Sequence, residues 1–254
     1  MEVMKLLFGI SFSLLMALVG YKKKAVSKDG AVAGFFVGIC SCVFGGYRGA
    51  SVLFFFFFSS SLLTRFKGKN KKQIEHGHKK GGQRNWVQVF SNGVAGSIFA
   101  LFFALTSSGT ILNVNEPPID LYDNFWATFY IIGYISHYAC CNGDTWASEL
   151  GVVMGAVQPL LLLGIKDGKV LLLKRVPRGT NGAVSLFGCL ASIAGGLLVG
   201  IAFELANILL NGFSLSQLCL SLFIGASAGF IGSTVISFCV LLSKFPSIYV
   251  IYTD

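Results

Sequence analysis

Two carboxylates stand between long apolar runs in the segment CCNGDTWASELG, residues 140–151. Charged side chains are costly inside a bilayer, so carboxylates kept beside apolar runs indicate a functional polar site. On a helix, at roughly 100° per residue, Asp144 and Glu149 would lie about 140° apart. They would flank one ion from different sides or have different roles. Mg²⁺ is held by one or two carboxylates plus phosphate oxygens. The alternative for Asp144 is helix N-capping, which leaves Glu149 unexplained.

A second polar segment, KRVPRGTNGAVS, covers residues 174–185. Pro177 ends any preceding helix, Gly179 and Gly182 free the backbone, and an apolar run begins near residue 183. A helix N-terminus binds anions because its amides are unpaired and its dipole is positive. Lys174 and Arg178 add full charges, so this segment is a candidate phosphate site; the alternative is a basic loop that contains a turn.

A third segment, KKGGQRNWVQVFSNG, covers residues 79–93. A helix starting near residue 85 would carry Asn85, Gln88 and Asn92 in one stripe. Inside a membrane such a stripe must face the bundle or a cavity, since lipid offers no hydrogen-bond partner. The alternative is hydrogen bonding between helices.

The composition predicts the elements that must position these groups. The chain has 254 residues, of which 54% are hydrophobic and 12% charged, and its mean hydropathy is +0.71. Soluble domains contain about 25% charged residues. We therefore expect an all-α polytopic membrane helix bundle, one integral membrane domain over 1–254, with about seven spans. The candidate spans are 3–20, 31–46, 50–63, 86–107, 123–141, 183–210 and 216–243.

The basic residues predict the orientation of the bundle. With seven spans, all of the 20 Lys and Arg except Lys5 and Arg48 fall on one side, which the positive-inside rule makes cytoplasmic. The segment 64–85 is then a basic cytoplasmic loop, the N-terminus lies outside, and the net charge of +9 belongs to loops rather than to a nucleic-acid site. This count requires the run 150–165 to be a re-entrant, surface-lying or broken helix instead of a full crossing.

Three further features bear on the interior of the bundle. Glycines recur at helical spacing in 30–49, which favours close helix packing. His137 lies within a span and is either functional or a satisfied core residue. Glu204, also within a span, either lines a cavity or pairs with a nearby Lys or Arg.

GGQRNWVQVFSNG, GDTWASELG and VPRGTNG, in this order, resemble the transmembrane protein 19 family, also called domain of unknown function 92. The similarity runs from about residue 20 to about 235. The chain looks closer to the plant group of glucose-responsive growth regulators than to the chloroplast phytyl-phosphate kinase that the family also includes. More distantly, the Gly-Asp and basic Gly-rich segments are similar to CTP-dependent polyprenol kinases and phosphatidate cytidylyltransferases.

This resemblance implies a kinase-like transfer of a nucleotide phosphate, with CTP or another nucleotide and Mg²⁺, to a prenyl or other lipid monophosphate. Positioning and charge neutralisation are the main requirements of that chemistry. Asp144, Glu149 and Arg84 would be catalytic, with Asp144 and Glu149 as metal ligands. The phosphates would be held by Lys174, Arg178, Gly179, Thr180, Asn181 and Gly182, and the lipid phosphate or nucleotide would contact Gln83, Arg84, Asn85, Gln88 and Asn92.

The chain departs from the family pattern at two places. Leu160 stands at a family arginine position, before an apparent insertion, and Ile236 stands at a family aspartate position. We expect 237–254 to be a divergent, truncated C-terminal end and this form to be inactive if that aspartate is essential. The alternatives to an enzyme are a non-catalytic membrane regulator of glucose-responsive growth that binds anionic lipid, and a small-solute transporter. A plasma membrane or endomembrane is expected rather than a chloroplast.

Overall fold

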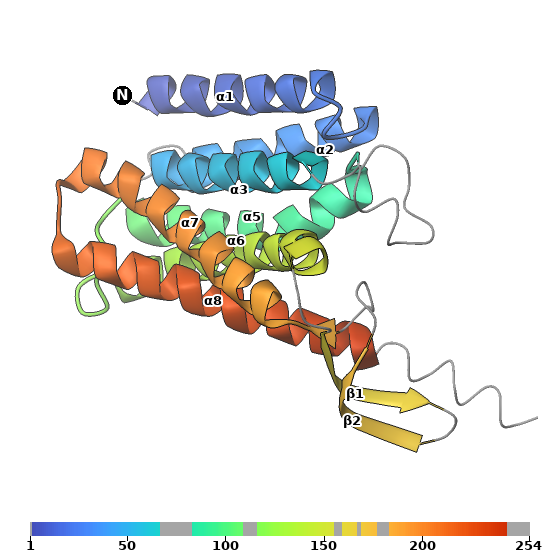
Figure 1. Cartoon of the computed structure of the whole chain (residues 1–254). Coiled ribbons are helices and arrows are strands. Elements are labelled where there is room, and N and C mark those ends of the chain that lie inside the picture. Colours follow the sequence, from blue (N-terminus) through green and yellow to red (C-terminus); the bar gives the residue numbers. More distant parts are fainter. Residues whose placement is uncertain are drawn as a thin grey trace, which may run out of the picture.

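A computed structural model describes residues 2–66, 83–108, 116–154, 159–166, 169–176 and 183–242. This part of the chain is a bundle of long helices with one small sheet at its edge (Figure 1). The helices are α1 (Glu2–Lys22), α2 (Lys28–Ile39), the π-helix η1 (Cys40–Phe44), α3 (Gly46–Phe66), α5 (Trp86–Ser108), α6 (Phe125–Met154), α7 (Leu186–Asn211) and α8 (Leu215–Leu242).

The bundle confirms the prediction of an all-α polytopic membrane protein. Among the described residues, α1, α3, α5, α7 and α8 are each long and apolar enough to cross a bilayer. The shorter α2 continues directly into η1, and α6, with 30 residues, carries the polar segment around Asp144. Each candidate span of the sequence therefore overlaps one helix or, for 31–46, the pair α2 and η1.

Successive helices run in alternating directions, so the polar segments gather at one end of the bundle. This basic end holds the last turns of α1, α3, α6 and α8 and the first turns of α2, α5 and α7 (right in Figure 1). At this end a hydrogen bond connects α2 with α5, since the Trp86 backbone amide donates to the Asp29 carboxylate at 3.0 Å. Lys5 and Arg48 belong to the opposite end, as the positive-inside count requires.

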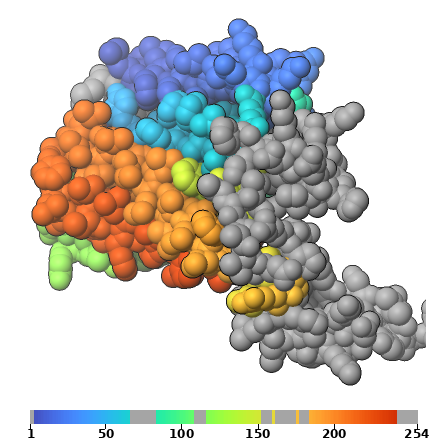
Figure 2. Space-filling view, viewed as in Figure 1, coloured from blue at the N-terminus to red at the C-terminus, as the bar shows by residue number. Residues whose placement is uncertain are grey.

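The core lies where α3, α5, α6 and α7 meet. Tyr134, Tyr138, Phe103 and Phe203 are fully buried there. α6 packs extensively on both α7 and α8, whereas α1 lies along the outside of the bundle with most of its length exposed (blue in Figure 2). The buried centre is thus built around α6, the helix that carries both candidate carboxylates.

The run 150–165 is not a re-entrant or broken helix, which corrects our expectation. Residues 150–154 continue α6, and β1 (Leu160–Lys166) pairs antiparallel with β2 (Lys169–Arg175) and, at its start, with β3 (Ala183–Val184). The register pairs Lys166 with Lys169, leaving the sequence Asp-Gly between them. Asp-Gly favours a two-residue hairpin connection, a local signal that outweighs the apolar composition.

Two expected segments fall partly outside the described residues. Of the basic loop 64–85, residues 67–82 lie outside them, while 64–66 end α3 and 83–85 precede α5. Of the divergent end 237–254, residues 237–242 form the last turns of α8 and 243–254 lie outside. Both segments begin at the basic end of the bundle (Figure 1).

Candidate functional site

Arg84 is fixed by its backbone to the turn between α1 and α2. Its amide donates to the Ala25 carbonyl at 3.0 Å, and the Ser27 amide donates to the Arg84 carbonyl at 3.0 Å, which together make a short parallel bridge. Gly30 passes so close to the Arg84 carbonyl that any Cβ at residue 30 would collide with it. The turn between α1 and α2 and the first residues of α2 therefore hold this arginine at the basic end.

The Arg84 side chain lies largely inside the protein. Its guanidinium carbon is 5.8 Å from the centre of the Phe56 ring on α3, and burial lowers the pKa of the guanidinium while the Glu149 carboxylate opposes that change. Arginine remains charged in proteins, so a positive charge is kept in a mostly apolar surrounding. Glu149 is itself buried, with 8% of its surface exposed. The structure thus brings together two of the three residues predicted to be catalytic.

Asp144 lies on α6 more than one turn before Glu149 and faces a different neighbour. It is half-buried beside the Ser233 hydroxyl of α8. The preceding Gly143 fits between Gly229 of α8 and the Ser192 carbonyl of α7, where a Cβ would come within 3 Å of the backbone. The two carboxylates therefore diverge from α6, as their spacing predicted, and Asp144 is mid-helix, so it does not N-cap α6.

These placements limit how a metal could be held. No group of three His, Cys, Asp or Glu that could bind a metal is found among the described residues. Asp144 and Glu149 face different helices, so they do not form a ready pair for one ion. Mg²⁺ nevertheless needs only one or two carboxylates when phosphate supplies further oxygens, and Asp144 beside Ser233 fits that minimal requirement. Glu149 is instead close enough to Arg84 for its charge to act on the guanidinium.

The row of amides has a different arrangement from the expected stripe. The Gln88 amide N–H donates to Asn85 Oδ1 at 3.0 Å, and the Asn85 amide N–H donates to Gln88 Oε1 at 3.2 Å. This reciprocal pair is a capping box that starts α5, and both residues are exposed, as is Gln83. Asn92 is half-buried and lines a cavity together with Arg84. Asn92 and Arg84 therefore remain as the inward-facing polar groups of this segment.

The glycine-rich segment lies partly outside the described residues. Arg178, Gly179, Thr180, Asn181 and Gly182 are outside them, and Lys174 belongs to β2. The chain after this segment is placed: β3 leads to Ser185, whose hydroxyl accepts from the Gly188 amide at 3.0 Å and caps α7. Gly151 of α6 packs against Gly188 and Ser185. The chain thus emerges from this segment beside the turn of α6 that follows Glu149.

A buried polar cluster at the opposite end of the bundle was not predicted. Arg48 is fully buried; its Nε donates to Glu116 Oε2 at 3.3 Å, and its Nη1 donates to the Pro117 carbonyl at 2.8 Å and to Asn207 Oδ1 at 3.3 Å. Glu204, also buried, accepts from the Asn207 amide and the Ser221 hydroxyl. The signal in the sequence was Arg48 itself, an isolated arginine on the side that should lack basic residues.

A second unpredicted residue is Asn142, two positions before Asp144. It is fully buried, accepts hydrogen bonds from the Ser59 and Ser60 hydroxyls of α3 at 3.0 and 2.9 Å, and donates to the Gly195 carbonyl of α7 at 2.8 Å. The signal that could have suggested this contact is the run of serines in FFFFFSSS, residues 54–61, because serine side chains hydrogen-bond between membrane helices. His137 is a satisfied residue, with its Nε2 2.8 Å from the Asn92 carbonyl.

Comparison with known proteins agrees with this architecture. The family model described as integral membrane protein DUF92 matches residues 11–239. Protein PGR of Arabidopsis thaliana is 36% identical over 235 residues, which are 91% of this chain and 76% of that protein. An uncharacterized membrane protein of Synechocystis is 29% identical over 75% of this chain and 64% of its own length.

A third relative, an uncharacterized membrane protein of Methanocaldococcus jannaschii, is 26% identical over 78% of this chain and 70% of its own length. No solved structure matches the chain. The matched region contains, in whole or in part, all seven α-helices and the π-helix among the described residues, together with Arg84, Asp144 and Glu149. The chain therefore belongs to the DUF92 family of integral membrane proteins.

Proposed function

We propose that this protein transfers a nucleotide phosphate to a lipid monophosphate at the basic end of its bundle. The observation that supports this most is the largely buried Arg84, which lines an apolar cavity and is acted on by the charge of the buried Glu149. A helix bundle gains little stability from a buried charge pair, because the loss of hydration offsets the attraction. A guanidinium kept inside the protein is well suited to an anionic oxygen, which it can hold bidentately.

Each charged residue has a role in this proposal. Arg84 holds the phosphate of the lipid, and Glu149 keeps the guanidinium oriented. Asp144 would hold Mg²⁺ together with phosphate oxygens, and the ion would neutralise charge on the transferred group. Lys174 and the glycine-rich segment 178–182 would bind the nucleotide phosphates, for which CTP is our first candidate. Phosphoryl transfer needs chiefly this positioning.

The proposal is tested by a transfer assay on the full chain in nanodiscs. Farnesyl, geranylgeranyl and phytyl monophosphates are offered with Mg²⁺ and each of CTP, ATP, GTP and UTP labelled at the γ-phosphate, and lipid diphosphate is measured. We expect product with at least one pair of substrates. Asp144→Asn and Arg84→Met should each lower the rate at least a hundredfold.

The matched controls are Asp123→Asn and Arg65→Met, which remove an exposed carboxylate near the opposite end and an exposed arginine at the end of α3. Both should keep the rate of the unaltered protein. Absence of product in all combinations from folded protein, or full activity of Asp144→Asn, would refute the proposal. We place the reaction at the cytoplasmic surface of the plasma membrane or an endomembrane, where the basic end also meets anionic lipid.

A further inference from the structure

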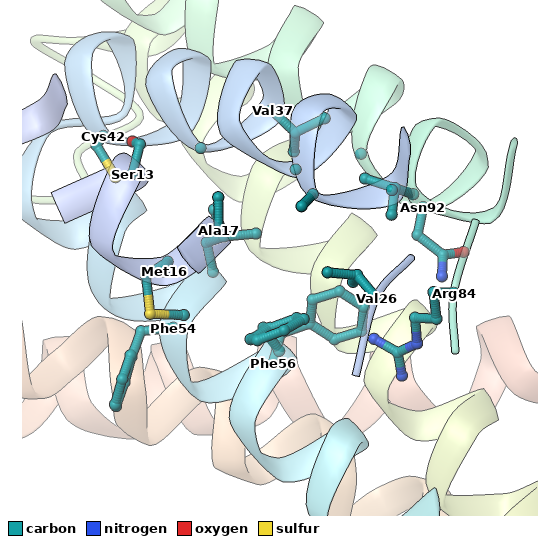
Figure 3. A pocket seen from close by; sticks show the side chains of 18 of the residues that line it. Ser13, Met16, Ala17, Val26, Val37, Cys42, Phe54, Phe56, Arg84 and Asn92 are labelled. Atoms are coloured by element: carbon teal, nitrogen blue, oxygen red, sulfur yellow. The ribbon is translucent and has the colours of Figure 1, made fainter. Parts of the chain in front are cut away.

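An apolar cavity opens between α1, α2, α3 and α5. About 70 Å³ of it can hold the centres of water-sized groups, several times the roughly 10–15 Å³ that one water needs. Ser13 and Cys42 lie at its inner end, whereas Arg84 and Asn92 lie at the end that belongs to the basic face (Figure 3). Between these ends the wall is made of side chains such as Val37, Phe54 and Phe56.

The glycines of α2 show that this space is part of how the helices pack. Gly30, Gly34 and Gly38 form one stripe with a spacing of four residues. A Cβ at residue 30 would collide with the Arg84 carbonyl, and one at residue 38 would lie 2.9 Å from the Ser13 Cβ. These two glycines serve close packing. A Cβ at Gly34 would have no atom within 4 Å, because Gly34 faces the cavity.

Among the residues that line the cavity, the one charged residue is Arg84, which lies at the end toward the basic end of the bundle. The Arg84 guanidinium lies over the Phe56 ring, at 5.8 Å from its centre. It is largely buried, and the charge of the Glu149 carboxylate acts on it. A buried cation at the mouth of an apolar channel matches a molecule with one hydrocarbon chain and one anionic head.

We infer that this cavity holds the single hydrocarbon chain of a lipid monophosphate, with its phosphate at Arg84 and its chain end near Ser13 and Cys42. The inference rests on the proposed function for the role of the head group, but it concerns binding and can be measured without turnover. It assigns α1 and α2 to chain recognition, while α6 and the start of α7 act on the phosphate. The space beside Gly34, where a Cβ would meet no atom within 4 Å, is then kept open for the ligand.

The test measures binding of farnesyl monophosphate and dodecyl phosphate to the full chain in detergent, without nucleotide. Gly34→Leu extends a side chain into the cavity from a helix position where a Cβ meets no atom within 4 Å, and leucine favours helix more than glycine. We expect it to weaken binding of both ligands at least tenfold. Val32→Leu, on the exposed face of α2, is the matched control and should bind as the unaltered protein does. Preference for farnesyl over dodecyl phosphate would identify an isoprenoid chain, and the reverse an unbranched one.

Arg84→Met distinguishes binding of the phosphate head group from binding of the hydrocarbon chain. It should weaken farnesyl monophosphate at least tenfold and leave farnesol binding unchanged. The inference is overturned if Gly34→Leu binds both phosphates normally, if farnesol binds as tightly as its phosphate, or if two-chain phosphatidic acid competes equally well. Binding with these variant effects but without phosphate transfer would support the cavity as a lipid site and refute the proposed kinase activity. Normal phosphate transfer by Gly34→Leu would support the kinase activity and refute the cavity as the lipid site.

Discussion

Arg48 and Glu116 form a buried ion pair, with 3.3 Å between Nε and Oε2, although 67 residues separate them in the chain. The same carboxylate accepts from the Tyr47 and Arg48 amides at the start of α3, where negative charge is favoured by the helix dipole. Arg48 also stacks between the Phe103 and Phe203 rings, at 5.6 and 5.1 Å. Arg48 and Glu116 thus connect three parts of the chain at the end away from the candidate site. These parts are α3, α7 and the segment that precedes α6.

Glu116→Gln should strongly destabilise the protein, because Arg48 is then left as a buried charge without its counter-ion. Breaking a buried ion pair costs about 3–5 kcal/mol. Thermal unfolding in detergent measures the change. Arg65→Met, which removes an exposed arginine at the end of α3, should leave the unfolding temperature nearly unchanged. Equal stability of the two variants would show that the pair contributes little.

Asn142→Leu should also lower the unfolding temperature. The substitution leaves the Ser60 hydroxyl and the Gly195 carbonyl without their partner, and each unsatisfied buried polar group costs about 1–3 kcal/mol. Ser148→Ala is the control, since the exposed Ser148 hydroxyl bonds only to its own helix at the Thr145 carbonyl. A stable Asn142→Leu variant would mean that these helices find new partners at no cost.

Two glycine-to-alanine substitutions should change stability in opposite directions. At Gly225 of α8 a Cβ would collide with the Gly196 carbonyl of α7, so Gly225→Ala should cost about 1–3 kcal/mol through overpacking. At Gly34 the space is open, so Gly34→Ala should gain up to about 1 kcal/mol from helix propensity. Thermal unfolding of both variants in one detergent provides the comparison, and a loss at Gly34 would contradict the open cavity.

Labelling of single cysteines tests the orientation of the bundle. In a chain whose seven native cysteines are replaced by alanine or serine, Lys23→Cys should react with a membrane-impermeant thiol reagent from the cytoplasmic side. Tyr122→Cys, at a position 96% exposed before α6, should react from the other side. Both positions lie outside the helices, so labelling from the same side would overturn the predicted topology.

Sequence reasoning predicted the helices well because lipid imposes a simple rule on the backbone. Apolar runs such as 86–107 and 216–243 became α5 and α8 with boundaries shifted by a few residues. The run 150–165 was misinterpreted because its leucines fit a membrane helix as well as a strand, and only the Asp-Gly between Lys166 and Lys169 distinguishes them.

For the candidate site, the sequence predicted the directions of side chains on one helix better than their contacts with other helices. The divergence of Asp144 and Glu149 follows from helical geometry, and the structure shows it. The amide stripe was a reasonable inference from spacing, but Asn85 and Gln88 lie at the very start of α5, where unpaired backbone amides compete for their side chains. The neighbours of Arg84 come from α3 and α6, and one sequence without covariation gives no indication of such distant contacts.

The direct junction of α2 with η1 has a consequence for the surrounding lipid. The stretch Lys28–Phe44, at about 1.5 Å per residue, is about 25 Å long. The hydrocarbon thickness of a typical membrane is about 30 Å. Since α1 lies outside this stretch and covers only part of it, acyl chains bordering α2 must shorten or disorder to match it. The protein is thus expected to thin its annular lipid on one flank, beside the cavity whose mouth Arg84 marks.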